Sequence, residues 1–262
     1  MWPVWPSATA SQMASPWPGK FRPMDLGIAG KVCLVTASSK GLGRASAAAL
    51  RDEGADVVIC GRGKEAVDET VDALGGPSHV LGLVEDVTDP DAPARLVAAT
   101  LARFGRLDIV VPNAGGPPPA RALEVTDDQI AAAVNANLVT SVRLVREALP
   151  PMRDAGWGRV CCIASYSVKQ PVPTLALSNL SRTGLWAWVK TASQDLGPTG
   201  ITINLACPGP HATDRMKQLG GTGPMGDPGD FGKVVAFLCS EPAKFVNGVA
   251  LQVDGGATLG LL

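Results

Sequence analysis

The sequence predicts an α/β fold with a doubly wound, seven-stranded parallel sheet and helices on both of its faces. Two observations support this prediction. From Lys31 onward, short apolar runs alternate with longer amphipathic segments. The short runs place Val, Ile and Leu at consecutive positions, which is typical of parallel strands buried on both faces. Right-handed crossovers between such strands then produce the double winding.

The elements follow one another along a single domain. Strands are expected at residues 31–37, 56–61, 79–87, 107–113, 158–165, 201–209 and 249–256. Helices are expected at residues 41–54, at 64–74, from 88 onward, from 126 towards 152, at 177–196 and from 227 onward. Three of the helix starts carry capping signals, which are Thr88-Asp89-Pro90, the capping-box spacing from Thr126 to Gln129, and Asp227-Pro228.

Charge and composition exclude several classes of partner. A net charge of −1 leaves no basic footprint for nucleic acid or an anionic membrane, and no apolar run is as long as a membrane span. The six cysteines show no Cys-x-x-Cys spacing, and the two histidines, His79 and His211, are isolated. Neither a metal site nor a disulfide framework is therefore expected, and a reducing, cytoplasmic location is the simplest interpretation.

Residues 1–23 differ in composition from the rest of the chain. They are rich in Pro, Ser, Ala and Trp and have no hydrophobic periodicity. A segment of this kind does not fold alone. We expect a disordered leader over 1–23, or a chain that ordinarily starts at Met24, followed by one domain over 24–262. Deletion of residues 1–23 should leave the melting temperature unchanged.

A glycine-containing turn joins the first expected strand to the first expected helix. It reads Thr-Ala-Ser-Ser-Lys-Gly-Leu-Gly over residues 36–43. Gly41 and Gly43 would let the backbone approach a pyrophosphate, whose charge the helix N-terminus stabilises. The alternative is an ordinary turn between a strand and a helix, and only the surrounding motifs separate the two interpretations.

Four motifs in order resemble the short-chain dehydrogenases/reductases, whose domain is a Rossmann fold. The turn at 36–43 is similar to that family's TGxxxGxG turn, with Ala37 in place of the first glycine. The others are Asp86-Val87 for the adenine-contacting pair, Asn113-Ala114-Gly115 for NNAG with Pro112 replacing its first Asn, and Pro208-Gly209 to Thr213 for PGxxxT. The resemblance covers nearly everything from about Met24 onward and implies a dinucleotide cofactor.

The residues after the second strand favour NADP(H) over NAD(H). NAD-binding folds place an acid there for the ribose hydroxyls, whereas NADP-binding folds place a base there for the 2′-phosphate. Here the strand ends in Gly61-Arg62, and Lys40 adds a second positive charge nearby. The alternative is that both are solvated surface charges. The residues expected to bind the cofactor are Thr36, Ser38, Ser39, Lys40, Gly41, Leu42, Arg62, Asp86, Val87, Asn113, Ala114, Gly115, Arg182, Pro208, Gly209 and Thr213.

The resemblance breaks at the catalytic residues. The family uses Asn, Ser, Tyr and Lys, and the matching positions here are Asn137, Ser165, Ser178 and Arg182. The usual phenol acid is absent, and a serine hydroxyl is a far weaker acid. Arg182 keeps the charge of the lysine and can bond the nicotinamide ribose, but it does not cycle as a base. This replacement resembles the divergent 3-oxoacyl-carrier-protein-reductase-like branch, which does not supply a substrate.

Another group would then have to supply the proton. The only tyrosine, Tyr166, follows Ser165 directly, and Lys169 and His211 lie in segments expected to border the nicotinamide. His211 has the most suitable reference pKa, about 6.5. Water is a further source. Each side chain also has a structural interpretation, since Tyr166 could cover the cleft, Lys169 could be solvated and His211 could fill a loop.

Three functions are compatible with these residues. The first is an NADP(H)-dependent oxidoreductase that acts on a carbonyl or an alcohol of a small molecule. The second is a non-redox enzyme, such as a cyclase, dehydratase or isomerase, that reuses the cleft. The third is a catalytically silent nucleotide-binding protein. Turnover of a carbonyl panel with NADPH separates the three.

Two further segments bear on the substrate and on assembly. Residues 213–227 are short and rich in glycine, so a small, mobile lid is expected there rather than a large pocket. Trp186 and Trp188 lie on the helix that carries Ser178 and Arg182. They would either face a partner subunit, giving a homodimer or homotetramer, or cover the protein's own core.

Overall fold

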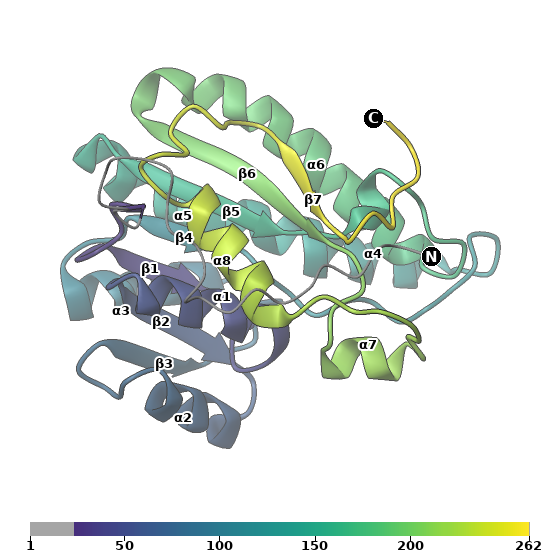
Figure 1. Cartoon of the computed structure of the whole chain (residues 1–262), viewed down its shortest axis with the longest axis horizontal. Coiled ribbons are helices and arrows are strands. Elements are labelled where there is room, and N and C mark those ends of the chain that lie inside the picture. The colour runs from purple at the N-terminus through teal and green to yellow at the C-terminus, as the bar shows by residue number, and fades with distance from the viewer. Residues whose placement is uncertain (1–23, 262) are drawn as a thin grey trace, which may run out of the picture.

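The computed structural model describes residues 24–261, and the expected leader over 1–23 lies outside them. These residues form one sheet of seven parallel strands in the order β3-β2-β1-β4-β5-β6-β7, as the sequence predicts (Figure 1). The strands are β1 (Val32–Val35), β2 (Asp56–Gly61), β3 (Val80–Val84), β4 (Ile109–Val111), β5 (Gly158–Ile163), β6 (Ile201–Pro208) and β7 (Ala250–Val253).

Helices cover both faces of the sheet, which confirms the predicted double winding. They are α1 (Gly41–Asp52), α2 (Lys64–Ala73), α3 (Ala92–Phe104), α4 (Asp127–Val134), α5 (Thr140–Ala155), α6 (Ala176–Leu196), α7 (Asp214–Gln218) and α8 (Pro228–Leu238). On one face, residues of α1, α2 and α8 pack against the sheet, and α1 and α8 lie side by side (Figure 1). Residues of α3, α5 and α6 pack on the other.

The strands are short, and the central ones are almost completely buried because helices cover both their faces, whereas the edge strands β3 and β7 are partly exposed. All four residues of β1 and all eight residues of β6 are buried. The six cysteines are free thiols and are buried too, so each serves as a small apolar side chain. Within residues 24–261, no helix is both long and apolar enough to cross a membrane.

The helix starts follow two of the three predicted caps. Thr126 forms the expected capping box with Gln129, and the Asp227 carboxylate accepts hydrogen bonds from the backbone at the start of α8. The third prediction was wrong, because α3 begins at Ala92 rather than beside Pro90. The Asp89 carboxylate accepts from the Asp91 amide at 2.9 Å and holds the preceding residues in a turn.

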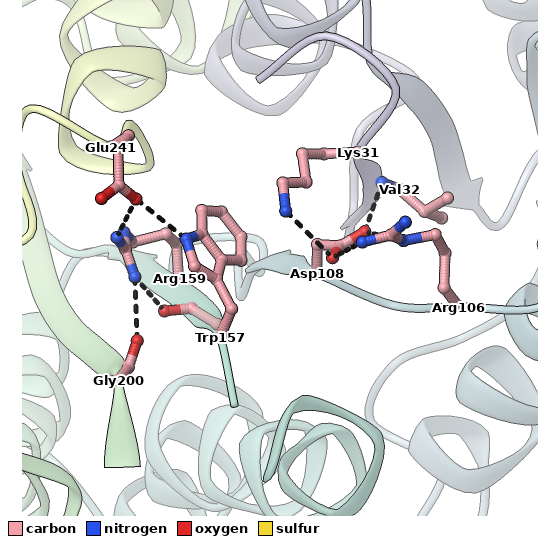
Figure 2. A network of polar contacts seen from close by, with 9 residues as sticks. Lys31, Val32, Arg106, Asp108, Trp157, Arg159, Gly200 and Glu241 are labelled. Atoms are coloured by element: carbon pink, nitrogen blue, oxygen red, sulfur yellow. Dashed lines mark hydrogen bonds and ion pairs between the residues drawn. The ribbon is translucent and has the colours of Figure 1, made fainter. Parts of the chain in front are cut away.

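The amino ends of the central strands are held together by buried charges (Figure 2). Arg159 at the start of β5 is fully buried, and its guanidinium donates to the carbonyls of Gly158, Gly200 and Ser240 and to the Glu241 carboxylate. The same carboxylate accepts from the Trp157 indole at 3.0 Å. Glu241 is therefore the counter-charge for a buried cation.

We expect Glu241→Gln to lower the free energy of unfolding by about 1–3 kcal/mol, because it leaves the Arg159 guanidinium without a counter-charge. The indole N–H, with Lys244 and Arg159, holds the pKa of Glu241 below its ordinary value. A depressed carboxyl pKa contributes stability above its unfolded value and loses it as the pH falls through the folded value. Denaturant unfolding should therefore separate the two proteins at neutral pH and not in strong acid. Glu147→Gln, an exposed change on α5, is the matched control.

Candidate active site

A cleft runs along the carboxyl ends of the parallel strands, where ligands of such sheets collect. It consists of two adjoining cavities of about 480 and 400 Å³. Both are lined by Ala37, Lys40 and residues 114–117, which follow β1 and β4. The first cavity extends towards Arg62 and Asp86, and the second towards Ser165 and Ser178. The cleft thus joins the expected cofactor residues to the expected catalytic residues.

The turn between β1 and α1 approaches the chain after β4 very closely. A Cβ atom on Gly43 would lie 2.6 Å from the Ala37 carbonyl oxygen and 2.7 Å from the Asn113 side-chain nitrogen, so only glycine fits at this position. The Asn113 amide donates to that same carbonyl at 3.1 Å. Thr36 and Asn113 also exchange hydrogen bonds of 2.8 Å in both directions. The conformation of the turn is therefore fixed by hydrogen bonds to Asn113, which follows β4.

Two of the predicted cofactor residues build the turn and do not line the cleft. Ser38 is fully buried, and its hydroxyl donates to the Val35 carbonyl and accepts from the Cys60 amide. The Thr36 hydroxyl is engaged with Asn113. The other predicted cofactor residues all line one or both cavities; these are Ser39, Lys40, Gly41, Leu42, Arg62, Asp86, Val87, Asn113, Ala114, Gly115, Arg182, Pro208, Gly209 and Thr213.

Ala37, which stands where the family has its first glycine, adopts a left-handed backbone with φ of 45°. We expect Ala37→Gly to stabilise the protein by about 0.5–1 kcal/mol, since the relieved strain exceeds the added entropy of the unfolded chain. Denaturant unfolding measures this difference. Ala48→Gly, inside α1, should have the opposite sign. An unchanged or lower stability for Ala37→Gly would contradict the assignment of strain to this residue.

The far end of the first cavity carries the charges that distinguish the two nicotinamide cofactors. Arg62 and Lys40 are both exposed and both line it, and neither forms an ion pair within residues 24–261. Asp86 is held in a turn by the Thr88 amide and hydroxyl at 3.0 and 2.8 Å. These hydrogen bonds, together with the charge of Arg62, lower the pKa of Asp86 and keep it ionised.

The second cavity brings Ser165, Ser178 and Arg182 together from two elements. Ser165 follows β5, and its hydroxyl oxygen accepts from the Ser167 amide at 3.1 Å, which leaves its proton free to donate. Ser178 and Arg182 lie one helical turn apart on α6 and are both buried. The Arg182 guanidinium donates to the carbonyls of Ile163 and Ala164 at 2.9 and 3.0 Å. These bonds hold α6 against the end of β5.

Burial lowers the pKa of Arg182 to about 10, and the positive charge of Arg215 acts in the same direction. Arg182 is nevertheless protonated at neutral pH. It therefore supplies a fixed positive charge and hydrogen-bond donors to the cavity, and it is not a base at pH 7.

Asn137 lies in a π-helical turn, Asn135–Val139, that separates α4 from α5. Such turns interrupt regular helices frequently at functional sites. The residue is buried and lines the first cavity, and its Oδ1 atom has no hydrogen-bond partner within the described chain. A buried carbonyl oxygen without a partner is costly, so this atom is suited to a ligand or an ordered water.

The three side chains considered as proton donors lie in different surroundings. Tyr166 and His211 line the second cavity, and Lys169 does not. The Lys169 ammonium lies 5.7 Å from the centre of the Trp186 ring. One ring nitrogen of His211 is bonded to the Gly209 carbonyl at 3.0 Å, and its ring packs edge-on against Phe231. Of the three, Tyr166 lines the cavity and its phenol forms no hydrogen bond to the described chain.

One feature of the cleft, the position of Arg215, has no clear signal in the sequence. The segment expected as a lid contains α7, capped by the Thr213 hydroxyl, and this short helix places Arg215 in the second cavity. No motif marks Arg215, because its position depends on a contact with the chain after β4. Trp186 and Trp188 are half-buried and pack against the protein's own core, which favours the second of the two interpretations of these residues.

Comparison with known proteins gives the same fold and family. The family described as enoyl-(acyl carrier protein) reductase matches residues 36–258. Dehydrogenase/reductase SDR family member 4 of Sus scrofa is 32% identical, over 94% of this chain and 92% of that protein. The uncharacterized oxidoreductase YvrD of Bacillus subtilis (strain 168) is 29% identical, over 89% of this chain and 98% of that protein.

Two solved structures are similar over most of the chain. L-sorbose reductase from Gluconobacter frateurii, complexed with NADPH and L-sorbose, has a TM-score of 0.85 and 28% identity, and the match covers 91% of this chain and 100% of that one. Actinorhodin polyketide ketoreductase with NADPH has a TM-score of 0.80 and 30% identity, with 87% and 97% covered. With the matched motifs around the cleft, these similarities show that the chain belongs to the short-chain dehydrogenase/reductase superfamily.

Proposed function

We propose that this protein is an NADP(H)-dependent oxidoreductase that interconverts a carbonyl and an alcohol on a small molecule through an atypical active site. The observation that carries the proposal is the continuous cleft. It joins the glycine turn, Arg62 and Lys40 at one end to Ser165, Ser178 and Arg182 at the other. Two structurally similar members of the superfamily have been solved with NADPH, which supports the choice of cofactor.

The residues of the cleft fit a phosphorylated dinucleotide. Gly41 at the start of α1 lines the second cavity and carries no side chain, so a pyrophosphate can approach the backbone amides there. The Arg62 guanidinium and the Lys40 ammonium form no ion pair within the described chain and suit a 2′-phosphate. We expect Arg182, at the position of the family's lysine, to bond the nicotinamide ribose.

When bound, the reduced cofactor supplies a hydride to the carbonyl carbon and becomes NADP⁺, while the carbonyl oxygen takes a proton. The part of this chain is to orient and polarise that oxygen. The free proton of Ser165 donates to it, and Ser178 adds a second hydroxyl from α6. Asn137 would hold an ordered water on its unpartnered Oδ1 atom.

We assign the proton to Tyr166, with water as the alternative source. Tyr166 is the only phenol in the chain, lines the cavity and follows Ser165 directly. His211 is less suited because its ring is held by the Gly209 carbonyl and by Phe231. Tyr166→Phe should lower kcat about 100-fold or more if the phenol is the acid. The same loss in His211→Gln, with Tyr166→Phe unaffected, would reverse the assignment.

The test of the function is turnover of NADPH with a panel of aldehydes, ketones and oxo acids, followed by the loss of reduced-nicotinamide absorbance. Oxidation that collapses in Ser165→Ala supports the proposal. The absence of the family's phenol at position 178 favours a second candidate, a non-redox enzyme of the same fold. Conversion of a substrate without oxidation of NADPH would select that candidate, and tight NADPH binding without any conversion would indicate a silent protein.

We also propose that the chain forms a homo-oligomer. Large apolar side chains remain exposed on α6 and α8, at Leu180 and Phe237, and beyond α8 at Phe245. Because α6 and α8 pack on opposite faces of the sheet, these residues offer separate apolar surfaces for contact between subunits. Analytical ultracentrifugation of the full chain should give a dimer or a tetramer, and a monomer at micromolar concentration would contradict the proposal.

A further inference from the structure

Arg215 reaches from the short helix α7 across the mouth of the second cavity. Its guanidinium donates to the Pro117 carbonyl in the loop after β4, at 2.5 Å. A Cβ atom on Gly116 would lie 3.2 Å from two of its nitrogens, so the group rests directly on this loop. Arg215 thereby joins two segments that border the same cavity as Ser165 and Ser178.

This end of the cleft has an excess of positive charge. Its lining includes Arg182, Arg215 and Lys40, and its only acidic residue is Asp214, which is exposed and pairs with Lys217 at 3.2 Å. Over residues 24–261, neither arginine pairs with a carboxylate. The Arg182 guanidinium bonds only to two backbone carbonyls.

Two neighbouring guanidinium groups without a counter-ion are unfavourable in a partly closed cavity. Burial, and to a lesser extent the positive charge of Arg215 in the same cavity, lowers the pKa of Arg182, because both disfavour the charged guanidinium. An anion bound beside Arg215 would offset this unpaired charge and would gain charge-assisted hydrogen bonds. Lys40, Arg182 and the start of α1 are assigned to the cofactor, so Arg215 is the cation of this cavity that is left for another anion.

The cofactor already has other partners for its phosphates. Gly41 and Leu42 at the start of α1 suit the pyrophosphate, and Arg62 in the first cavity, with Lys40 lining both cavities, suits the 2′-phosphate. Arg215 shares its cavity with the serines that face the reacting carbonyl. We propose that Arg215 binds a carboxylate of the substrate, so that the protein acts on oxo acids and hydroxy acids in preference to neutral carbonyl compounds. This inference rests on the proposed function, since it names the substrate class of the same site.

The test compares each acid with its uncharged ester. Acetoacetate and pyruvate are assayed beside their methyl esters with wild type, Arg215→Gln and Arg215→Lys. Arg215→Gln is expected to raise KM for the acids about 10- to 100-fold, with KM for the esters and the Kd for NADPH changed less than about threefold. Arg215→Lys keeps the positive charge but loses the bidentate geometry of the guanidinium, so its KM for the acids should lie between those of wild type and Arg215→Gln. Lys190→Gln, an exposed change on α6 that lies outside both cavities, is the control for a general effect of charge and should leave all values unchanged.

Three outcomes overturn the inference. They are equal losses for acids and esters, a wild type that prefers the esters, and a loss confined to NADPH affinity, which would assign Arg215 to the cofactor. A binding measurement distinguishes failure of the carboxylate assignment from failure of the proposed oxidoreductase function. If no carbonyl is reduced, 3-hydroxybutyrate should still raise the melting temperature of the NADPH-bound wild type and not that of Arg215→Gln. Equal shifts, or none, would also reject the carboxylate site.

Discussion

Replacing Ser165 by alanine should lower kcat for carbonyl reduction about 100- to 1,000-fold, the usual effect of removing one donor to a developing oxyanion. The expected loss is large because Ser165 lines the cavity and its hydroxyl oxygen accepts from the Ser167 amide, which leaves its proton available to the substrate. No phenol at position 178 shares this role. Stopped-flow or steady-state kinetics with NADPH measures the effect on kcat. The Kd for NADPH should stay within about threefold of wild type.

Ser181→Ala is the matched control for this result. Ser181 lies on α6 close to Ser178, is fully buried, and donates to the Leu177 carbonyl within its own helix at 2.8 Å. Its removal should leave kcat unchanged. The Ser165→Ala protein should also lose about 1 kcal/mol of stability, because Ser165 caps the short turn that follows β5. A Ser165→Ala enzyme with wild-type turnover would refute the proposed role.

Reversing the charge at Arg62 should change the preferred cofactor. We expect Arg62→Glu to weaken NADPH binding about 100-fold or more, equivalent to about 2.7 kcal/mol, since a guanidinium–phosphate contact becomes a repulsion. NADH binding should change little or improve, because a carboxylate at this position can accept from the ribose hydroxyls. Fluorescence titration with both nucleotides measures the ratio of their dissociation constants.

Arg146→Glu provides the control for a general effect of charge. Arg146 is exposed on α5 and does not line the cleft, so this change should weaken NADPH binding by less than about twofold. Salt should reduce the preference of the wild type for NADPH, as expected for an exposed charge contact. Equal or tighter binding of NADH by the wild-type protein would show that Arg62 and Lys40 are ordinary surface charges.

The fold could be predicted from the sequence because its signals are local. A parallel strand covered on both faces needs apolar residues at consecutive positions, as in β1 and β6. A capped helix needs a hydroxyl or carboxylate at its start, as at Thr126 and Asp227. The start of α3 could not be placed in this way. Asp86 and Asp89 formed turns of their own, and local hydrogen bonds of this kind compete with helix formation.

The candidate site could be predicted only in part. Residues that follow a motif's spacing could be located, whereas the direction in which their side chains point could not. Ser165, Ser178 and Arg182 follow motif spacing within two adjacent elements, and the structure places them in one cavity. Ser38 and Thr36 also belong to a motif, yet their hydroxyls are used inside the turn. A motif records which residue types occur together and does not state which of them face the ligand.

The sequence by itself determined the succession of strands and helices, the glycine turn, the absence of a tyrosine at position 178 and the basic residue after β2. Only the tertiary structure decided which side chains meet in the cleft. Arg215 contacts the Pro117 carbonyl from 98 positions away, and Asn113 holds the Ala37 carbonyl across 76. The physical reason is that periodicity and capping depend on neighbours within a turn or two, whereas a site at the carboxyl ends of parallel strands is assembled by packing among segments far apart in the chain.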